Sequence, residues 1–263
     1  MIDIRLSDNL ELMAEMQDNT VDLIYCDILY GTGRKFKDYQ DLKPKREIIE
    51  KHYIPRIKEM HRVLKDTGSI YLQMDTRINH WIRCILDDVF GYDNFLNEII
   101  WEYPKGIKNS TLKQINNHDN IFHYKKEKYY HNIVLNDYTK KQLSRFNKID
   151  ENGKYYYDTR RDKSKNKYKV KVYLKKTGTP TGDVWYFNFE QGNNRLDYDT
   201  QKPKKLIERI IKASSNEGDL VADFYGGSFT TAEVCKDLNR NFIGCDISEK
   251  AVQIGRARVS GGF

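Results

Sequence analysis

Strand-like and helix-like segments alternate at both ends of this 263-residue chain. Short apolar runs rich in β-branched and aromatic residues predict strands at residues 20–26, 69–74, 97–101, 220–225 and 241–246. Apolar residues at helical spacing predict helices at residues 49–64, 82–90, 203–215 and 230–238. Strands joined through helices pair in parallel, so the alternation predicts an α/β fold built on a doubly wound, mostly parallel sheet.

A basic segment interrupts this alternation. Between Lys105 and Lys176 the chain has 20 Lys and Arg against 7 Asp and Glu, a balance of +13, whereas the remainder has 25 against 31. Nine tyrosines fall in the same segment. Cations mixed with aromatic rings suit the phosphates and bases of nucleic acid, so the segment is interpreted as an inserted nucleic-acid-binding module. A solvated, lysine-rich surface is the alternative.

Within the basic segment, apolar and cationic residues alternate over most of residues 166–176. Tyr168, Val170, Val172 and Leu174 would lie on one face of a strand. The opposite face would carry Lys165, Lys167, Lys169, Lys171 and Lys175. The pattern predicts a half-buried strand whose cationic face contacts DNA, with Lys165, Lys167, Lys169 and Lys171 as the phosphate-binding residues.

Several classes of protein are disfavoured by the sequence. No run approaches the roughly 20 apolar residues that cross a bilayer, and the first residues do not have the layout of a signal peptide, so we expect a cytoplasmic protein without a membrane partner. The four cysteines are scattered without a CxxC pair, which argues against a zinc site and a disulfide framework.

A candidate ligand loop follows the strand at 220–225. Asp223 is followed by Gly226 and Gly227, and Asp246 closes the next predicted strand 23 residues beyond Asp223. This order is typical of a nucleotide-type βαβ site, in which glycines allow close backbone approach and the acid accepts a ribose hydroxyl. The loop is neither GxGxxG nor GxxxxGK[ST], and a purely structural turn is the alternative.

Two motifs carry a resemblance to a known family. Residues 223–231, Asp-Phe-Tyr-Gly-Gly-Ser-Phe-Thr-Thr, resemble the cofactor motif of S-adenosylmethionine-dependent DNA methyltransferases that modify exocyclic amino groups. Residues 21–30, Val-Asp-Leu-Ile-Tyr-Cys-Asp-Ile-Leu-Tyr, resemble that family's catalytic strand and its (Asp/Asn/Ser)-Pro-Pro-(Tyr/Phe) motif. Three residues depart from the family pattern: Ile28 and Leu29 replace the prolines, and Phe229 replaces a glycine.

The order of the motifs is similar to that of the permuted β class. The resemblance implies a Rossmann-like methyltransferase fold with an inserted target-recognition region. Its expected parts are a catalytic half at 1–102, the basic insert at 103–182 and an S-adenosylmethionine-binding half at 183–263.

The same resemblance assigns roles to individual residues. Asp27 and the backbone carbonyl of Ile28 would accept hydrogen bonds from the target amino group, and Tyr30 would stack on the flipped base. The cofactor-binding residues would be Asp8, Lys202, Asp223, Tyr225, Gly226, Gly227, Ser228 and Asp246. The cofactor would be S-adenosylmethionine, and no metal is expected.

Asp27 favours a bacterial or phage DNA adenine-N6 methyltransferase, because aspartate is usual at this position in the adenine enzymes and serine in the cytosine enzymes. The alternatives are an N4-cytosine enzyme, a catalytically decayed DNA-binding relative, and an RNA methyltransferase. Double-stranded DNA is the expected partner. A second copy of the chain and a cognate restriction endonuclease are further candidate partners.

Overall fold

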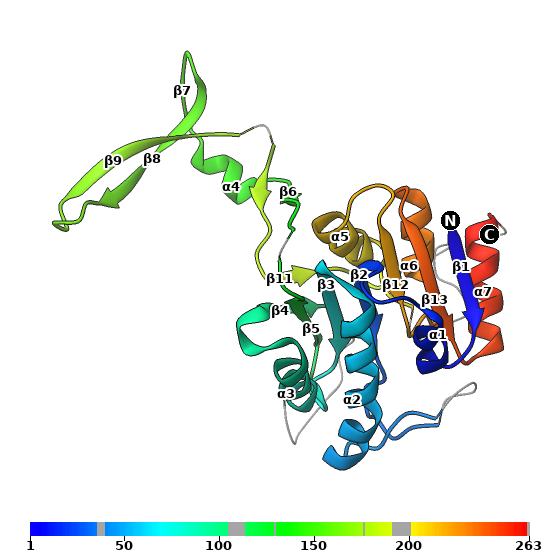
Figure 1. Ribbon diagram of the computed structural model, residues 1–263. Coiled ribbons are helices and arrows are strands. Elements are labelled where there is room, and N and C mark those ends of the chain that lie inside the picture. The colour runs from blue at the N-terminus through cyan, green and yellow to red at the C-terminus, as the bar shows by residue number, and fades with distance from the viewer. Residues whose placement is uncertain (36–39, 105–113, 129, 176, 191–200, 262–263) are drawn as a thin grey trace. The chain divides into compact units, whose positions relative to one another are not determined.

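Two compact units make up the chain in the computed structural model, which describes residues 1–35, 40–104, 114–128, 130–175, 177–190 and 201–261. Residues 1–132 and 183–263 form the first, here called the sheet unit. Residues 133–182 form the second, here called the inserted unit (Figure 1).

An eight-stranded sheet is the centre of the sheet unit. Its strands, in spatial order, are β1 (Ile2–Leu6), β13 (Asn241–Asp246), β12 (Leu220–Asp223), β2 (Val21–Asp27), β3 (Leu64–Met74), β5 (His118–Lys125), β4 (Phe95–Glu102) and β11 (Val184–Tyr186). The first five are mutually parallel, β5 is antiparallel to both β3 and β4, and β4 pairs in parallel with β11. The predicted doubly wound, mostly parallel sheet is confirmed.

Helices cover both faces of this sheet (Figure 1). One face packs against α1 (Asn9–Glu15), α2 (Arg46–Val63) and α3 (Asn79–Phe90). The other packs against α5 (Lys204–Ser214), α6 (Thr230–Asp237) and α7 (Glu249–Ser260). Strand β2 supplies both layers, since Ile24 and Cys26 belong to the first core and Leu23 and Tyr25 to the second. Its continuous apolar run therefore reflects burial on both faces.

Some elements of the sheet unit are not predicted by the sequence pattern. They are β1, α1, the 3-10 turn at Tyr92–Asn94, β5, β11 and α7. Strand β5 lies between β3 and β4 in the sheet, so the compact inserted unit spans residues 133–182, whereas the expected target-recognition region spanned residues 103–182. The basic residues before 133 therefore belong to the sheet unit.

The inserted unit is a small β structure. It contains β6 (Leu135–Asn136) paired with β10 (Thr179–Pro180), the short helix α4 (Lys140–Arg145), and a sheet of β7 (Lys148–Asp150), β8 (Gly153–Arg161) and β9 (Lys167–Tyr173). No residue among 133–175 and 177–182 is fully buried. Cations lie over aromatic rings instead: Arg145 over Tyr156 at 4.4 Å and Lys148 over Tyr157 at 4.5 Å.

Candidate functional site

The turn after β2 carries the predicted catalytic residues, and hydrogen bonds hold it where prolines were expected. Ile28 N–H donates to the carbonyl of Gln73 in β3 at 3.1 Å, a bond that proline cannot make. The Tyr53 hydroxyl of α2 donates to the carbonyl of Leu29 at 2.9 Å. The departure at Ile28 therefore gains a hydrogen bond to β3 that proline could not make, whereas the bond from α2 uses the carbonyl of residue 29, which a proline would also offer.

Asp41 holds the next part of this turn. Its carboxylate is 3% exposed and accepts the N–H groups of Gly31 at 3.1 Å and Thr32 at 2.7 Å, together with the Thr32 hydroxyl. Carboxylates that accept several N–H groups fix a loop strongly. Asp41 thus holds Gly31 and Thr32, whereas Tyr53 holds Leu29 nearer the start of the turn.

Asp27 lies between a cation and a phenol. One of its oxygens pairs with the Lys202 ammonium, and the other accepts the Tyr30 hydroxyl at 2.8 Å. Burial raises the pKa of the Asp27 carboxyl above its usual range, against the lowering effect of Lys202. Lys202 was expected to complete the cofactor pocket; it lines that cavity and also contacts the predicted catalytic carboxylate.

The predicted cofactor loop joins β12 to α6. Asp223, 2% exposed, accepts the Tyr225 N–H at 3.1 Å and the Thr231 hydroxyl at 2.7 Å. Burial raises the pKa of Asp223 to about 7. Gly227 has a positive φ of 50°, and its N–H donates to Asp246 at the end of β13 at 2.9 Å. These contacts fix the loop beside two carboxylates.

Phe229 occupies the core and not the cavity. It adopts the left-handed conformation, with φ 52° and ψ 36°, at a cost of roughly 1–2 kcal/mol for a non-glycine residue. Its ring is fully buried, and a Cβ on Gly226 or Gly255 would come within 2.4 or 2.5 Å of it. The two glycines therefore provide the space for the ring, and burial of the ring offsets the backbone strain.

A polar wall from α2 faces the cofactor loop. Arg56 pairs with Asp8 at 2.9 Å and donates to the side chain of Asn9 at 2.7 Å. His52 Nε2 lies 3.2 Å from the Tyr225 hydroxyl, and burial lowers the pKa of His52 to about 4, so the ring is neutral at pH 7. The wall therefore presents one cation, and that cation is already paired with Asp8.

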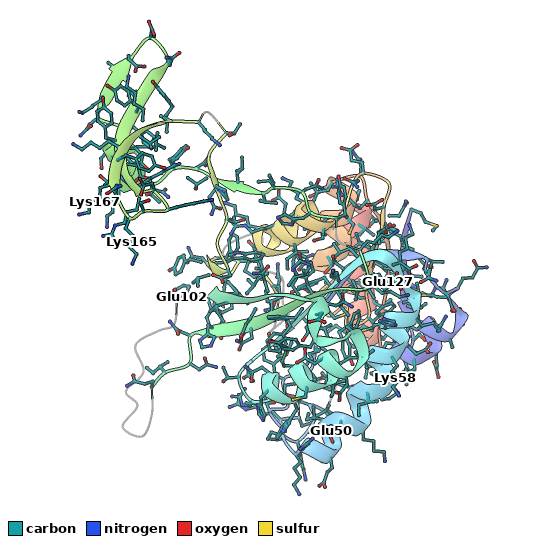
Figure 2. The ribbon with its side chains drawn as sticks, turned by 60° about the vertical axis from the view of Figure 1, so that its left-hand side comes forward. Glu50, Lys58, Glu102, Glu127, Lys165 and Lys167 are labelled. Carbon is teal, nitrogen blue, oxygen red and sulfur yellow. The ribbon has the colours of Figure 1, made fainter. Side chains whose placement is uncertain are left out.

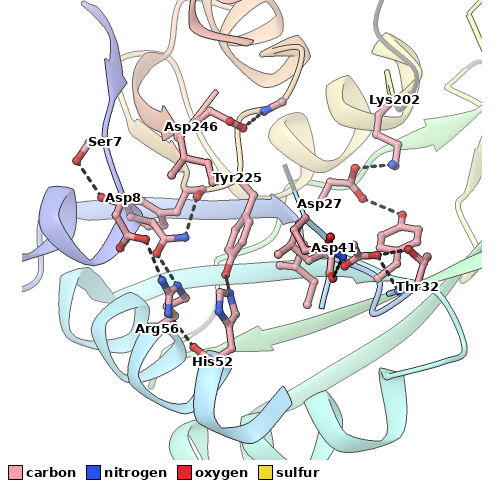
Figure 3. Close-up of a pocket in the computed structure, with 18 residues that line it drawn as sticks. Ser7, Asp8, Asp27, Thr32, Asp41, His52, Arg56, Lys202, Tyr225 and Asp246 are labelled. Atoms are coloured by element: carbon pink, nitrogen blue, oxygen red, sulfur yellow. Dashed lines mark hydrogen bonds and ion pairs between the residues drawn. The ribbon is translucent and has the colours of Figure 1, made fainter. Parts of the chain in front are cut away.

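One cavity brings these groups together at the carboxyl ends of the parallel strands, where open α/β sheets bind ligands (Figure 3). The predicted site residues that line it are Asp8, Asp27, Ile28, Tyr30, Lys202, Tyr225, Gly227 and Asp246. A smaller cavity shares Asp27, Lys202, Tyr225 and Gly227 with the first. Asp223, Gly226 and Ser228 line this second cavity. Motifs nearly 200 residues apart in the sequence therefore meet at one place.

Several residues of the site were not predicted. His52, Arg56 and Asp41 line the cavity, and Gln73 and Asp119 contact Tyr30. Asp119 lies near the start of β5, and because β5 is antiparallel, this start lies at the same edge as the ends of β2 and β3. A search for acids at strand ends misses such a residue. The polar run from Asn116 to Asn120 ahead of Ile121 was the available signal.

The four predicted phosphate-binding lysines differ in their surroundings. Lys165, with φ 64°, lies in the turn between β8 and β9 and not in the strand, which was wrongly extended to it (Figure 2). Lys167 and Lys169 lie in β9 and are exposed. Lys171 pairs with Asp150 at 2.6 Å and lies over the ring of Tyr155, so its charge is partly engaged. Lys176 lies outside the described residues.

Tyr168 was predicted to lie on the buried face of this strand, but it is 49% exposed. The inserted unit has too few layers to bury that side of β9. Lys167 lies opposite Arg161 across the ladder, and like charges opposite each other repel. A bound anion would relieve that repulsion.

Metal-binding clusters and membrane-spanning helices are both absent from the described ranges. No group of three or more His, Cys, Asp or Glu side chains there is arranged to hold a metal ion. No helix of the described ranges is both long enough and apolar enough to span a membrane.

Comparison with known proteins places these observations in a family. Residues 21–257 match the family model described as DNA methylase. The chain is 31% identical over 259 residues to the type II methyltransferase M.HpaI of Haemophilus parainfluenzae, a match covering 98% of this chain and 74% of that protein.

Two solved structures share the fold. The M1.HpyAVI complex with SAM is 19% identical with a TM-score of 0.63, covering 98% of this chain and 99% of that one. The PvuII DNA methyltransferase, described as cytosine-N4-specific, is 16% identical with a TM-score of 0.68, covering 98% and 86%. These likenesses concern the architecture of the whole chain.

Proposed function

The chain belongs to the DNA methylase family that its residues 21–257 match, and we propose that it methylates N6 of a flipped-out adenine in duplex DNA, with S-adenosylmethionine as methyl donor. At the level of the family it is a methyltransferase acting on exocyclic amino groups of DNA bases. The adenine target, the cofactor and the residue roles are the proposal.

The position of Asp27 carries this proposal. Its carboxylate lies in the cavity wall at the end of β2, next to Tyr30. The amino nitrogen of adenine is a weak nucleophile because its lone pair is delocalised into the ring. Acceptors on its two hydrogens favour a tetrahedral nitrogen and stabilise the charge that develops during transfer. The Asp27 carboxylate and the Ile28 carbonyl would be these acceptors.

The chemistry of the cavity fits a cationic cofactor that carries hydroxyls and an amine. Asp8 and Asp246 are hydrogen-bond acceptors, suited to the adenine amino group and the ribose hydroxyls of such a molecule. Asp223, with Gly226 and Gly227 beside it, would receive the methionine ammonium. When bound, the cofactor supplies an electrophilic methyl group on a positively charged sulfur.

The base must leave the duplex to reach this cavity. Rotating it out costs a few kcal/mol of stacking and pairing, which contacts in a pocket must replace. The Tyr30 ring, held at its hydroxyl by Asp27, would provide the stacking surface. Methyl transfer then depends on in-line placement of nitrogen, carbon and sulfur, which the fixed turn supports.

The inserted unit would hold the DNA. It has 14 Lys and Arg against 5 Asp and Glu, and its exposed cations include Lys165, Lys167 and Lys169. These residues would contact phosphates and contribute affinity for DNA without determining which DNA sequence is recognised. A second copy of the chain and a cognate restriction endonuclease stay predicted partners.

Methylation of unmodified plasmid DNA, followed by digestion to nucleosides and mass spectrometry, tests the proposal. We expect N6-methyladenine in reactions with the wild-type protein and none with Asp27→Ala. Exclusive 4-methylcytosine would contradict the adenine assignment. It would favour the N4-cytosine alternative, which is the specificity described for the PvuII methyltransferase that shares the fold.

A decayed, non-catalytic relative is the second alternative, and two observations argue against it. Phe229 packs in the core without lining either cavity, and the turn that lacks prolines is held by Gln73, Tyr53 and Asp41. Undetectable cofactor binding by the folded protein in the presence of DNA would favour that alternative. Competition between duplex DNA and RNA tests the third one, RNA methylation.

A further inference from the structure

One lysine lies against both predicted catalytic side chains. The Lys202 ammonium pairs with a carboxylate oxygen of Asp27 (Figure 3), and it lies 5.2 Å from the centre of the Tyr30 ring. Both partners of the ion pair are largely shielded from water, since the Lys202 side chain is 12% exposed and that of Asp27 20% exposed. Solvent and salt screen such a pair less than a surface pair, so Lys202 acts strongly on the carboxylate.

The chain next to Lys202 fixes its backbone. Pro203 follows directly, is buried and forms the N-cap of α5, where its carbonyl accepts the N–H of Leu206 at 3.0 Å. A proline disfavours helical backbone in the residue before it, so Lys202 stays outside the helix. Helix α5 packs into the second apolar core through Leu206 and Ile210. The ammonium is therefore held at the end of β2 from a rigid element.

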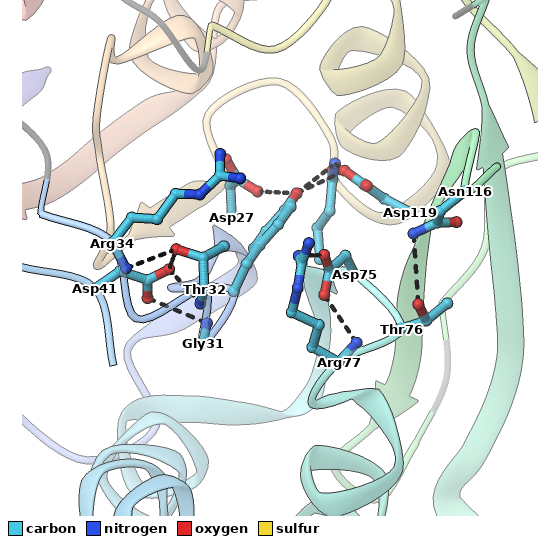
Figure 4. Close-up of polar contacts among 12 residues, drawn as sticks. Asp27, Gly31, Thr32, Arg34, Asp41, Asp75, Thr76, Arg77, Asn116 and Asp119 are labelled. Carbon is cyan, nitrogen blue, oxygen red and sulfur yellow. Dashed lines mark hydrogen bonds and ion pairs between the residues drawn. The ribbon is translucent and has the colours of Figure 1, made fainter. Parts of the chain in front are cut away.

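Asp119 competes with Asp27 for the hydrogen of Tyr30. The Tyr30 hydroxyl is 2.8 Å from Asp27 and 2.6 Å from Asp119 (Figure 4). A hydroxyl carries one hydrogen, so it can donate to only one of the two carboxylates at a time. An ammonium carries three hydrogens, so the contact with Lys202 is not subject to this competition. Asp27 therefore keeps Lys202 as a partner whichever way the hydroxyl points.

Most of the surroundings of Asp27 favour its neutral form. Burial raises the pKa of the Asp27 carboxyl, the ion pair with Lys202 lowers it, and the charge of Asp119 raises it. Burial also raises the pKa values of Tyr25 and Cys26 well above their usual ranges, so both are neutral at pH 7. The charged and titratable groups that face Asp27 from β2, the following turn, β5, β12 and the start of α5 are Tyr25, Cys26, Tyr30, Asp119, Asp223 and Lys202. Lys202 is the cation of this set.

The role proposed for Asp27 needs the ionised form. An ionised carboxylate offers lone pairs on both oxygens, whereas the neutral acid carries a hydrogen on one of them. Only the ionised form also balances the positive charge that develops on the amino nitrogen during transfer. A buried acid with an unfavourable environment therefore requires a group that keeps it charged.

We propose that Lys202 is a positioning residue for methyl transfer, which keeps Asp27 ionised and holds one of its oxygens so that the other is available to the target amino group. This inference rests on the proposed function. Lys202 neither gives nor takes a proton in this role. Its ammonium hydrogens that do not contact Asp27 can still serve the cofactor cavity, which Lys202 also lines.

The pH profile of single-turnover methyl transfer by Lys202→Met, at saturating cofactor and DNA, tests the inference. Methionine keeps the length of the side chain and removes its charge. Loss of the ion pair raises the pKa of Asp27, so the acidic limb should move about one to two pH units higher. Just above the wild-type limb the rate should fall about tenfold, and it should recover as the pH rises. A lower rate at every pH with an unmoved limb would indicate a structural role and overturn the inference.

Lys202→Arg provides the conservative variant. Arginine keeps the positive charge but changes the shape of the donor group. The acidic limb should therefore stay within about half a pH unit of the wild-type limb, even where the rate falls a few-fold. A limb that moves as far as that of Lys202→Met would show that charge is not the cause.

Lys65→Met is the matched control. Lys65 pairs at 2.7 Å with Asp22, which lies on the same strand as Asp27, but neither Lys65 nor Asp22 lines a cavity. This variant should lose some stability without moving the acidic limb. A shift as large as that of Lys202→Met would overturn the inference.

Thermal unfolding of the cofactor-free protein gives a readout without activity. The folded pKa of Asp27 is above its unfolded value, so the contribution of this group to stability is lost as the pH rises through the folded pKa. Removing Lys202 raises that folded pKa further, so Lys202→Met should lower Tm more at pH 8 than at pH 5. In an Asp27→Asn background, which has no carboxyl to titrate at this position, Lys202→Met should lower Tm equally at both pH values.

Failure of the inference differs from failure of the proposed function. Equal losses of Tm at pH 5 and pH 8 in the protein that retains Asp27, with an unmoved limb, would overturn the role of Lys202. Wild-type protein that shows the pH-dependent loss but does not methylate DNA would refute only the proposed function.

Discussion

The sheet unit and the inserted unit are stabilised in different ways. The sheet unit contains every fully buried residue of the described chain, and its site lies on the ends of strands that pack into two apolar cores. The inserted unit relies on short strands and on cations over rings. A catalytic site must position atoms to within about an ångström, so it needs the support of packed apolar cores. Phosphate contacts tolerate the looser support of short strands and cations over aromatic rings.

Charge divides along the same boundary. The inserted unit has a balance of +9, from 14 basic and 5 acidic residues, and the sheet unit a balance of −2, from 31 and 33. The contrast predicts that changes in the sheet unit alter chemistry or cofactor affinity, and that changes in the inserted unit alter DNA affinity.

Asp27→Ala should have the largest effect. Removing the carboxylate that would accept from the amino group should lower kcat by about a thousandfold or more, with the cofactor Kd largely unchanged. Single-turnover kinetics and calorimetry measure the two quantities. Turnover close to wild type would refute the assigned role.

Neutralising Lys165, Lys167 and Lys169 together should lower DNA affinity by about tenfold to a hundredfold at moderate salt, because each lost phosphate contact reduces the salt slope by about 0.9. Lys171→Gln is the matched variant. It should reduce the slope less and destabilise the inserted unit more, since Lys171 pairs with Asp150. An unchanged slope in the triple variant would show that these lysines do not contact DNA.

Asp246→Ala should weaken cofactor binding by about tenfold, through the lost ribose contact and the freed Gly227 N–H. Asp219→Ala is the control, because Asp219 also accepts a backbone N–H, that of Asn216 at 2.7 Å, but lines neither cavity. Calorimetry of both variants measures the difference. Equal cofactor Kd values for the two variants would show that Asp246 does not contact the ribose.

Cofactor affinity should depend on pH through Asp223. Its pKa of about 7 means that the carboxyl becomes protonated below that pH and loses its attraction for an ammonium group. The cofactor Kd should therefore rise toward tenfold per pH unit below pH 7 in the wild type, and much less in Asp223→Asn. A Kd that is flat from pH 5.5 to pH 8 would contradict this role for Asp223.

Tyr53→Phe should have the smallest effect. Losing the bond to the Leu29 carbonyl should cost about 1 kcal/mol of stability and lower kcat a few-fold by loosening the turn. Tyr71→Phe, which removes a buried hydroxyl 2.7 Å from Ser214, should lower stability without lowering kcat. The same kcat for both variants would show that the turn does not depend on Tyr53.

The parts of the molecule predicted from the sequence are those with a local signal. The strands that end with Asp27, Asp223 and Asp246 are mainly apolar, and each acid is the last residue of its strand. Parallel pairing then brings the three carboxylates to one edge of the sheet. These relations follow from hydrophobic pattern and chain order.

The remaining parts depend on contacts distant in sequence. Asp119 reaches the site only because β5 is antiparallel, and Arg56 only because α2 packs beside α1. The space for Phe229 depends on Gly255, 26 residues further along the chain. None of these partners leaves a periodic or spaced pattern in the sequence.

Single-turnover methyl transfer by the Lys165, Lys167 and Lys169 triple variant at saturating DNA tests the division between the two units most directly. We predict a rate within about twofold of wild type once binding is saturated, because these lysines would contribute binding and not chemistry. A rate at saturation that falls toward that of Asp27→Ala would contradict the division, since the inserted unit would then contribute to the chemical step.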